Sequence, residues 1–361
     1  MKIGDDWMVK IDLYVRNLSG KGGTEVVVNS LLNMIEKYPT NLSIHLIVSD
    51  YMENLSWLSK NVRQSASVRK IKFQNKKIKK LESLGYTFIK MVFSNAEIIL
   101  CTTPLQIKIA KLVKKIFFKK CKIVSWFHFN LKSDYLDGKE HLIKQADYHL
   151  CISQGIKEEL IKIGVDEKRV YIINNPVKMV NHRIMNSKDI HFISIGRLSM
   201  EKNHIELIEA LNKLNKRQFK LSIYGDGDTF PLLEKKVKEY GVEEQVFFKG
   251  WIDDPWENIS EATALVLTSR YEGFGMVLTE AISRGLPVVS SDCVGPKSIV
   301  NGNNGYLYSL GNVEELSQRL LDIANNRERF DKERVVYSIL DYYDQYYIEN
   351  FVNIVKQIAL V

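Results

Sequence analysis

Two glutamates in a glycine-containing segment are the side chains whose types and spacing point most directly to chemistry. Glu272 and Glu280 follow the apolar run Ala264–Leu267. Gly273 and Gly275 stand between that run and an apolar pattern with helical spacing, which predicts a strand, a tight turn and a helix. Glycines let the backbone approach a ligand closely, and a helix N-terminus attracts phosphate. Carboxylates accept hydrogen bonds from hydroxyl groups, so the segment predicts a site for a phosphorylated, hydroxyl-bearing ligand.

A second segment, Ser194–Asn203, places two cations at the end of another predicted strand. The guanidinium of Arg197 and the ammonium of Lys202 suit a diphosphate, the first through its fork of donors and the second as a point charge. The two cations of this segment and the two glutamates of the first segment also fit a purely structural role. The cations would then be solvated, Glu272 would be a loop acid, and Glu280 would stabilise the start of its helix through the dipole.

The histidine with the most distinctive surroundings is His128, which lies among Trp126, Phe127 and Phe129 after a predicted strand. It is the best candidate ligand contact among the seven histidines, although a packed or capped histidine fits the same pattern. The other histidines have no comparable motif.

Several other motifs are incomplete. Asp226-Gly227-Asp228 has the form of an Asp-x-Asp metal motif, but its position after a strand favours a turn. No metal-ligand set is apparent. The glycines at Gly20–Gly23 lack the Gly-Lys-Ser/Thr ending of a phosphate-binding P-loop, and Gly225 and Gly227 do not complete G-x-G-x-x-G, which argues against ATPases and dinucleotide enzymes.

The elements that must position these residues alternate between strand and helix along the whole chain, which predicts an α/β protein with two doubly wound sheets. The strands expected in the first half are Val9–Val15, Leu42–Val48, Glu97–Cys101, Lys122–Trp126 and Tyr148–Ile152. Those expected in the second half are His191–Ile195, Phe219–Tyr224, Val246–Lys249, Ala264–Leu267 and Pro287–Ser290. Open α/β sheets bind ligands beyond the carboxyl ends of their strands, so two such domains imply a cleft between them.

The length of 361 residues also favours two domains. The strand–helix pattern breaks after Asn175-Pro176-Val177, which predicts domains at 1–178 and 179–337. The Tyr-rich apolar segment near the C-terminus, about 338–361, is expected to form a helix that packs back on the first domain.

The four cysteines are far apart and form no Cys-x-x-Cys pair, which favours a reducing compartment.

The net charge of +8 is divided unequally, because residues 1–180 carry 30 Lys and Arg against 17 Asp and Glu. This basic half predicts an anionic partner: a membrane surface, a nucleic acid or a phosphorylated acceptor. Arg69–Lys80 and Lys111–Lys122 could bind an anionic membrane, although a solvated helix face fits them equally. No recognisable RNA- or DNA-binding module accompanies them, so a nucleic-acid partner is not expected.

The sequence has no secretory h-region or membrane-spanning run, so we expect a cytoplasmic protein, peripheral on the inner face of the membrane.

Several of these segments together resemble the retaining glycosyltransferases of family 4, which have the GT-B fold of two Rossmann-like domains facing each other across a cleft. Within that family they are most like the lipopolysaccharide core galactosyltransferases. The segments that carry the family resemblance are Gly22–Glu25, Asn175–Val177, Gly196–Leu198 with Glu201–Asn203, Glu272 and Glu280 with Glu-Gly-Phe-Gly, and Gly285–Val289. Those that are most like the lipopolysaccharide core galactosyltransferases are Ser125–Phe129, Ala146–Leu150 and Ser291–Pro296.

The resemblance implies that the first domain, 1–178, faces the acceptor and that the second, 179–337, binds the nucleotide sugar. It also implies a role for each matching residue. Arg197 and Lys202 would hold the donor diphosphate, Glu280 the ribose hydroxyls and Glu272 the hydroxyls of the transferred sugar. His128 would reach that sugar from the first domain. The remaining donor contacts would be the backbone of Phe274, Gly275, Met276 and Val277, the base-lining pair Gly250 and Trp251, and the loop glycines Gly22 and Gly23.

The reaction implied is the transfer of a hexose from a UDP-sugar to a hydroxyl of a cell-surface glycan of the lipopolysaccharide, capsule or exopolysaccharide type, with retained configuration. Galactose is the favoured sugar, and glucose and N-acetylglucosamine are the other candidates. No cofactor or metal requirement is expected. A UDP-sugar epimerase of the same architecture is the main alternative, and a nucleic-acid-binding protein is a weaker one.

Overall fold

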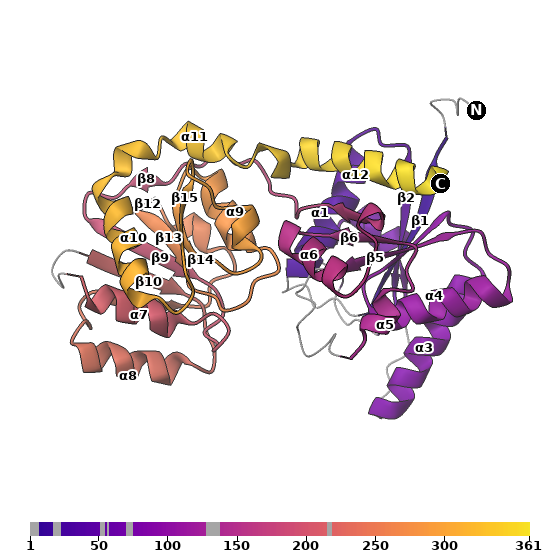
Figure 1. Cartoon of the computed structure of the whole chain (residues 1–361), viewed down its shortest axis with the longest axis horizontal. Helices are drawn as coiled ribbons and strands as arrows, with labels where there is room; N and C mark the ends of the chain where they lie inside the picture. The colour runs from indigo at the N-terminus through magenta and orange to yellow at the C-terminus, as the bar shows by residue number, and fades with distance from the viewer. Residues whose placement is uncertain are drawn as a thin grey trace. The chain divides into compact units, whose positions relative to one another are not determined.

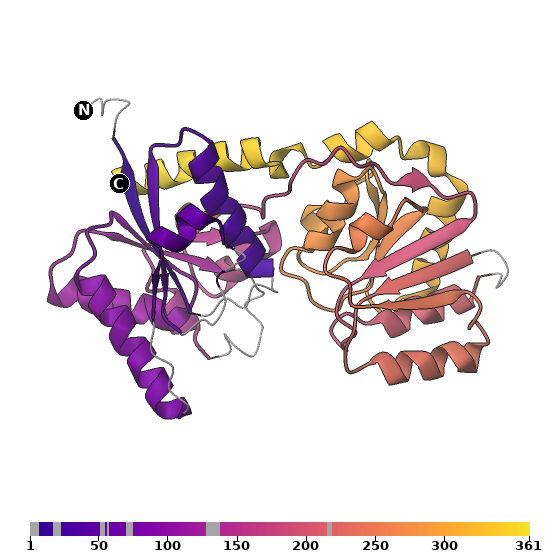
Figure 2. The ribbon, with the colours of Figure 1, turned by 180° about the vertical axis from the view of Figure 1, so that it is seen from behind.

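The computed structural model describes residues 7–16, 23–50, 55, 58–69, 75–127, 138–214 and 219–361. The chain divides into two compact units, each described here by itself (Figures 1 and 2). Unit 1 comprises Met1–Pro176 and Asp344–Val361, and unit 2 comprises Val177–Tyr343.

Unit 1 is built on a parallel sheet with the strand order β3-β2-β1-β4-β5-β6-β7. Its strands are β1 (Val9–Val15), β2 (Leu42–Val48), β3 (Ser67–Val68), β4 (Ile98–Cys101), β5 (Lys122–Phe127), β6 (Tyr148–Cys151) and β7 (Val170–Ile172). Its helices are α1 (Gly23–Lys37), α2 (Lys60–Ser65), α3 (Lys76–Val92), α4 (Pro104–Ile116), α5 (Glu140–Ile143), α6 (Gln154–Lys162) and α12 (Asp344–Leu360). β1 is an interior strand, because it pairs with β2 on one side and with β4 on the other.

Unit 2 repeats this arrangement with the strand order β11-β10-β9-β13-β14-β15. Its strands are β9 (Ile190–Ile195), β10 (Phe219–Tyr224), β11 (Val246–Gly250), β13 (Ala264–Leu267), β14 (Val288–Ser291) and β15 (Gly305–Tyr308), with a separate small pair, β8 (Met185–Asn186) and β12 (Glu261–Ala262). Its helices are α7 (His204–Asn212), α8 (Phe230–Tyr240), α9 (Met276–Ser283), α10 (Val313–Asn325) and α11 (Lys332–Tyr337). Short 3-10 helices of unit 2 are η2 (Pro255–Asn258), η3 (Pro296–Ser298), η4 (Arg327–Arg329) and η5 (Leu340–Tyr342), and η1 (Glu167–Arg169) belongs to unit 1.

Both sheets reverse their strand order at one point, between β1 and β4 in unit 1 and between β9 and β13 in unit 2. This is the Rossmann-like, doubly wound order, so the predicted fold class is confirmed. Parallel strands buried on both faces consist of nearly continuous apolar residues, and β4 and β13 are buried along their whole length. Such sheets place ligands at the reversal point, beyond the carboxyl ends of the strands.

The C-terminal helix α12 packs against α1 and β1 of unit 1. Its buried residue Phe351 lies 6.3 Å, between ring centroids, from Trp126 on β5. The return to unit 1 begins at Asp344, six residues after the expected 338, because the preceding residues pack within unit 2. There the backbone oxygen of Tyr342 accepts a hydrogen bond from the Val177 N–H at 2.8 Å.

None of the described helices is both long enough and apolar enough to cross a membrane.

Candidate active site

The loop that carries Arg197 is fixed by backbone contacts at the carboxyl edge of the unit 2 sheet. The Gly196 N–H donates to the Tyr224 carbonyl at 2.9 Å, and the Leu198 carbonyl accepts from the Thr229 N–H at 3.1 Å. The approach is so close that a Cβ on Gly225 would lie 1.9 Å from the Gly196 oxygen. The β9 and β10 loops therefore form one rigid edge, from which the exposed Arg197 extends without a hydrogen-bond or ion-pair partner among the described side chains.

Lys202 and Glu272 form an ion pair, although they come from different loops of the sheet edge. The Lys202 ammonium contacts Glu272 Oε1, and the Ser269 hydroxyl donates to the same oxygen at 3.0 Å. The two side chains are 24% and 14% exposed, respectively, so solvent and ligands can still reach them. The pair places an ammonium and a carboxylate side by side at the reversal point of the sheet.

Further contacts join the β9 and β13 loops around that pair. The Arg270 N–H donates to the Glu201 carbonyl at 2.8 Å, and its guanidinium donates to the Asn203 side chain at 3.2 Å. The Thr268 hydroxyl lies 3.1 Å from the Lys202 carbonyl, to which it donates. These bonds hold the backbone of Lys202 in place before any ligand arrives.

The turn before α9 is held by a third loop, the one that follows β14. Gly275 adopts a positive φ of 100° at the N-cap of α9, where a side chain would strain the backbone. The Gly295 N–H donates to the Glu272 carbonyl at 3.0 Å. Phe274 is buried against Tyr342, with 5.7 Å between ring centroids. Met276 and Val277 therefore begin a helix whose free N–H groups belong to a fixed turn.

Glu280 is held by Trp256, a residue that the sequence analysis did not select. The Trp256 indole N–H donates to Glu280 Oε2 at 2.9 Å, and the Arg284 guanidinium lies 4.7 Å from the centre of the Trp256 ring system. Burial raises the pKa of the Glu280 carboxyl, while the indole hydrogen bond and Arg284 act in the opposite direction. The structure therefore gives this carboxylate one direct donor and a fixed direction.

Replacing Trp256 with phenylalanine is expected to raise the KM for a nucleotide-sugar donor about tenfold and to change kcat by less than threefold. The phenyl ring fills most of the indole volume but cannot donate to Glu280, so the carboxylate loses its orientation and its charge loses a stabilising partner. Initial rates over a donor concentration series measure both constants. Trp7→Phe is the matched control, because Trp7 is a partly exposed residue just before β1 in unit 1 and has no part in the donor site; an equal KM effect in both variants would contradict the assignment.

Gly250 and Trp251 lie at the same edge as the cation-bearing loop. Gly250 ends β11 with φ of 70°, and its carbonyl accepts from the Gly225 N–H at 2.8 Å. Trp251 is 59% exposed, so its ring is available to a ligand. In unit 1, Gly23 is the first residue of α1, whereas Gly22 and His128 lie outside the described residues.

No group of three or more His, Cys, Asp or Glu side chains is placed to hold a metal ion in the part of the chain that the structure describes. Asp226-Gly227-Asp228 lies in the connection between β10 and α8, where Asp226 Oδ1 accepts from the Gly227 N–H at 2.7 Å.

His204 follows the Lys202 loop directly and is buried at the first position of α7. Burial, and secondarily the charge of Lys202, lower the pKa of this imidazole from its ordinary value of 6.5 to about 4. The folded protein therefore holds His204 neutral at a pH where the unfolded chain would protonate it.

Stability is consequently expected to fall as the pH drops from about 6.5 toward 4. In that window the unfolded state binds a proton at His204 that the folded state does not, so acid favours unfolding, by about 2 kcal/mol at pH 4.5 relative to pH 7. Urea unfolding at a series of pH values, on wild type and His204→Gln, measures this contribution, which the variant should lack. Parallel curves for wild type and His204→Gln would refute the assignment.

The comparisons with known proteins agree with this geometry. Residues 180–336 match the family model described as glycosyl transferases group 1. The lipopolysaccharide 1,6-galactosyltransferase of Salmonella typhimurium is 30% identical over 362 residues, covering 96% of this chain and 98% of that protein. The solved apo structure of the lipopolysaccharide outer core galactosyltransferase WaaB has a TM-score of 0.85 at 27% identity, covering 97% and 99% of the two chains. Anabaena HepE, solved with UDP and glucose, shares the fold with a TM-score of 0.78 at 16% identity, covering 97% of this chain and 100% of that one. The chain therefore belongs to the group 1 glycosyl transferases and has their GT-B fold.

Proposed function

We propose that the protein is a retaining glycosyltransferase of family 4 that transfers galactose from UDP-galactose to a hydroxyl of a lipopolysaccharide-type glycan. The observation that carries the proposal is the Lys202–Glu272 pair beside the glycine turn of α9, which offers a cation and a carboxylate at one sheet edge. The galactosyltransferase from Salmonella, aligned over almost the whole chain, supports the sugar and the acceptor class.

The proposed roles follow from where charge develops. As the bond between the sugar C1 and the diphosphate oxygen breaks, negative charge collects on UDP and positive charge on the sugar ring. Arg197, Lys202 and the free N–H groups at the start of α9 would stabilise the leaving diphosphate. The acceptor oxygen bonds to C1 on the same face, and its proton passes to the leaving phosphate oxygen.

The Lys202–Glu272 contact also satisfies both charges of the pair. Each group neutralises the other, so neither half-buried charge lacks a partner. A bound diphosphate would draw Lys202 toward it and leave Glu272 free to accept hydrogen bonds from hydroxyls of the sugar. Glu280, fixed by Trp256, would accept from the ribose hydroxyls. With the two cations neutralising the leaving group, the proposal requires no metal, and turnover should persist in EDTA.

The experiment that tests the proposal is transfer from UDP-galactose, UDP-glucose and UDP-N-acetylglucosamine to a lipopolysaccharide core acceptor that lacks the outer galactose. We expect UDP-galactose to give the fastest transfer, with an α-anomeric coupling constant in the proton NMR spectrum of the product. A β-linked product would overturn the retaining assignment. Conversion of a UDP-sugar to its epimer without any acceptor would favour the epimerase alternative instead.

We further propose that α3 and α4 rest on the inner face of the cell membrane. Apolar side chains are strongly exposed there, with Leu81 at 73%, Phe93 at 79% and Phe118 at 89%. The exposed Lys115 and Lys120 lie near Phe118 in the sequence, and this combination suits an anionic lipid surface. Sedimentation with anionic but not with neutral vesicles would support the proposal.

Arg69, the first cation of the basic stretch Arg69–Lys80, does not contribute to that face. Arg69 is only 5% exposed, and its guanidinium pairs with Glu82 at 3.2 Å. In the second stretch, Lys114 pairs with Asp147 at 2.7 Å. Both cations therefore have structural partners within unit 1, and the proposed lipid contact falls to other residues of the two stretches.

A further inference from the structure

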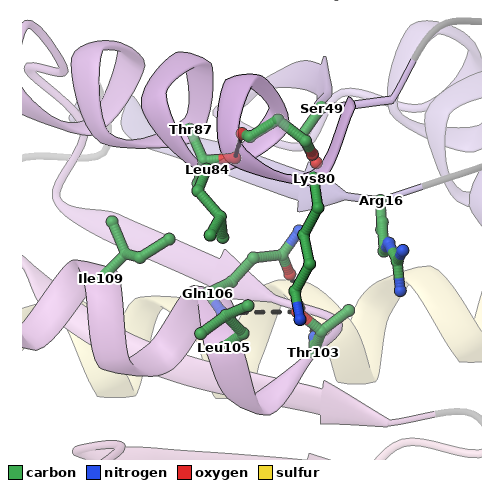
Figure 3. A pocket seen from close by; sticks show the side chains of 10 residues that line it. Arg16, Ser49, Lys80, Leu84, Thr87, Thr103, Leu105, Gln106 and Ile109 are labelled. Atoms are coloured by element: carbon green, nitrogen blue, oxygen red, sulfur yellow. Dashed lines mark hydrogen bonds between the residues drawn. The ribbon is translucent and has the colours of Figure 1, made fainter. Parts of the chain in front are cut away.

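A small cavity of about 60 Å³ lies in unit 1 between α3 and α4 (Figure 3). Arg16 and Ser49, which follow β1 and β2, line it from the sheet side, and Thr103 and Gln106 line it from the start of α4. The cavity therefore lies at the carboxyl edge of the unit 1 sheet, next to the reversal point between β1 and β4. Its volume exceeds the space that a single water needs and suits a group the size of phosphate.

Gln106 supplies a buried hydrogen-bond donor without an acceptor. Its side-chain oxygen accepts from the N–H groups of Thr102 and Thr103, each at 3.0 Å, and Thr103 in turn caps α4. Only the oxygen of an amide can accept, so these bonds fix the orientation of the side chain. The Gln106 NH₂ group then faces the cavity, and it has no hydrogen-bond partner within the described residues, although Gln106 is only 4% exposed.

Buried donors without partners are rare in native proteins, so this one calls for a ligand that the protein itself does not supply. The ligand must accept hydrogen bonds. The N-terminus of the thirteen-residue helix α4 adds its positive dipole end to the same wall of the cavity.

Lys80 gives the cavity a positive charge. Its side chain extends from α3 toward Thr103 and Leu105 (Figure 3), and its ammonium has no ion-pair partner among the residues with described positions. The other cation, Arg16, lies 3.4 Å from the Asp50 carboxylate, measured from Nε to Oδ2, so its charge is already partly compensated. The donors that remain, Lys80 and the Gln106 amide, suit an anion with several oxygen atoms.

We propose that this cavity binds a phosphate group carried by the glycan acceptor, and thereby selects phosphorylated acceptors. The inference rests on the proposed function, because it needs an acceptor that docks on unit 1. It extends that function by naming the class of acceptor and the residues that recognise it: Gln106, Lys80 and the start of α4.

The test compares transfer to a core oligosaccharide, released from lipid with its phosphates intact, with transfer to the same oligosaccharide after dephosphorylation. We expect kcat/KM of wild type to be about tenfold or more higher with the phosphorylated form. Gln106→Glu should reduce this preference to less than twofold, because glutamate keeps the capping box of α4 but turns an oxygen anion toward the cavity. Lys80→Gln should act in the same direction. Lys108→Gln, a charge change at an exposed position on α4 that does not line the cavity, should keep the full preference.

Binding of inorganic phosphate, followed by calorimetry or thermal shift, tests the cavity without any transfer reaction. Wild type and Lys108→Gln should bind phosphate, and Gln106→Glu should not. Absence of binding to wild type, or equal binding to Gln106→Glu, would overturn the site even if transfer proceeds. If inorganic phosphate binds but acceptor phosphates make no difference, the site takes free phosphate and the acceptor assignment is wrong. Phosphate binding without transfer from any UDP-sugar would instead refute the proposed function and, with it, the acceptor assignment.

Discussion

Replacing Lys202 with alanine is expected to lower kcat/KM for the donor by about 10²- to 10³-fold. The ammonium lies at the reversal point of the unit 2 sheet, on a loop whose backbone is held by Arg270 and Thr268, so it meets a diphosphate with little reorganisation. Its charge is needed most when the sugar–phosphate bond breaks and UDP becomes more negative. The loss should therefore fall more on kcat than on UDP binding, which steady-state kinetics and a UDP titration measure separately.

Removal of Lys202 also leaves the Glu272 carboxylate without its cation, and this side effect has to be separated from the catalytic one. Lys202→Ala combined with Glu272→Gln restores charge balance at the pair. If the double variant is as stable as wild type but much less active than Glu272→Gln alone, the additional loss belongs to the missing ammonium. Lys220→Ala is the matched control, because Lys220 forms only an exposed ion pair with Asp189 in the same unit. A Lys202→Ala enzyme within a fewfold of wild type would contradict the diphosphate assignment.

Glu272→Ala alone should distinguish the two partners. If its carboxylate contacts the sugar, turnover falls while UDP binds almost as in wild type, because UDP has no hexose to contact. If Glu272→Ala lost UDP binding and turnover equally, the assignment of Glu272 to the sugar would be wrong, and its only role would be as the partner of Lys202.

The elements with strong apolar runs were predictable from the sequence. β1, β2, β10 and β13 have the bounds expected, because each is a short, largely apolar run that is followed by a polar residue or a glycine. The closeness of Lys202 and Glu272 follows from the same reasoning, since both come after strands that run parallel in one sheet. Carboxyl ends of such strands meet at one edge, so the topology brings together residues that are seventy positions apart.

The contacts that the sequence did not indicate are those made by single side chains across irregular segments. Trp256 reaches Glu280 from a 3-10 turn, which has neither periodicity nor a motif that would select it. The segment before Asp344 is apolar and Tyr-rich, like the helix that follows, so composition did not reveal that Tyr342 packs on Phe274. The start of α4 did carry a signal, because Thr103 and Gln106 with Pro104 between them have the spacing of a capping box.

Substituting Gly225 with alanine is expected to destabilise unit 2 by about 3 kcal/mol or more and to abolish tight donor binding. A Cβ at this position would lie 1.9 Å from the Gly196 oxygen and 2.8 Å from its carbonyl carbon, both of them backbone atoms that no side-chain rotation can move. The φ of 147° adds backbone strain for any residue with a side chain. The cheapest relief is to push the Gly196–Leu198 loop away, which displaces Arg197 from the sheet edge.

Two variants distinguish the position of the loop that carries Arg197 from the charge of Arg197 itself. Arg197→Ala should lose donor affinity but retain wild-type stability, because the exposed guanidinium has no partner in the described structure. Gly225→Ala should lose both, as urea unfolding and a UDP titration would record. Gly302→Ala is the matched control, since a Cβ there has no atom within 4 Å. If Gly225→Ala unfolds at the wild-type urea midpoint and binds UDP normally, the close contact between the β9 and β10 loops does not position Arg197, and the rigid edge proposed for donor binding has to be abandoned.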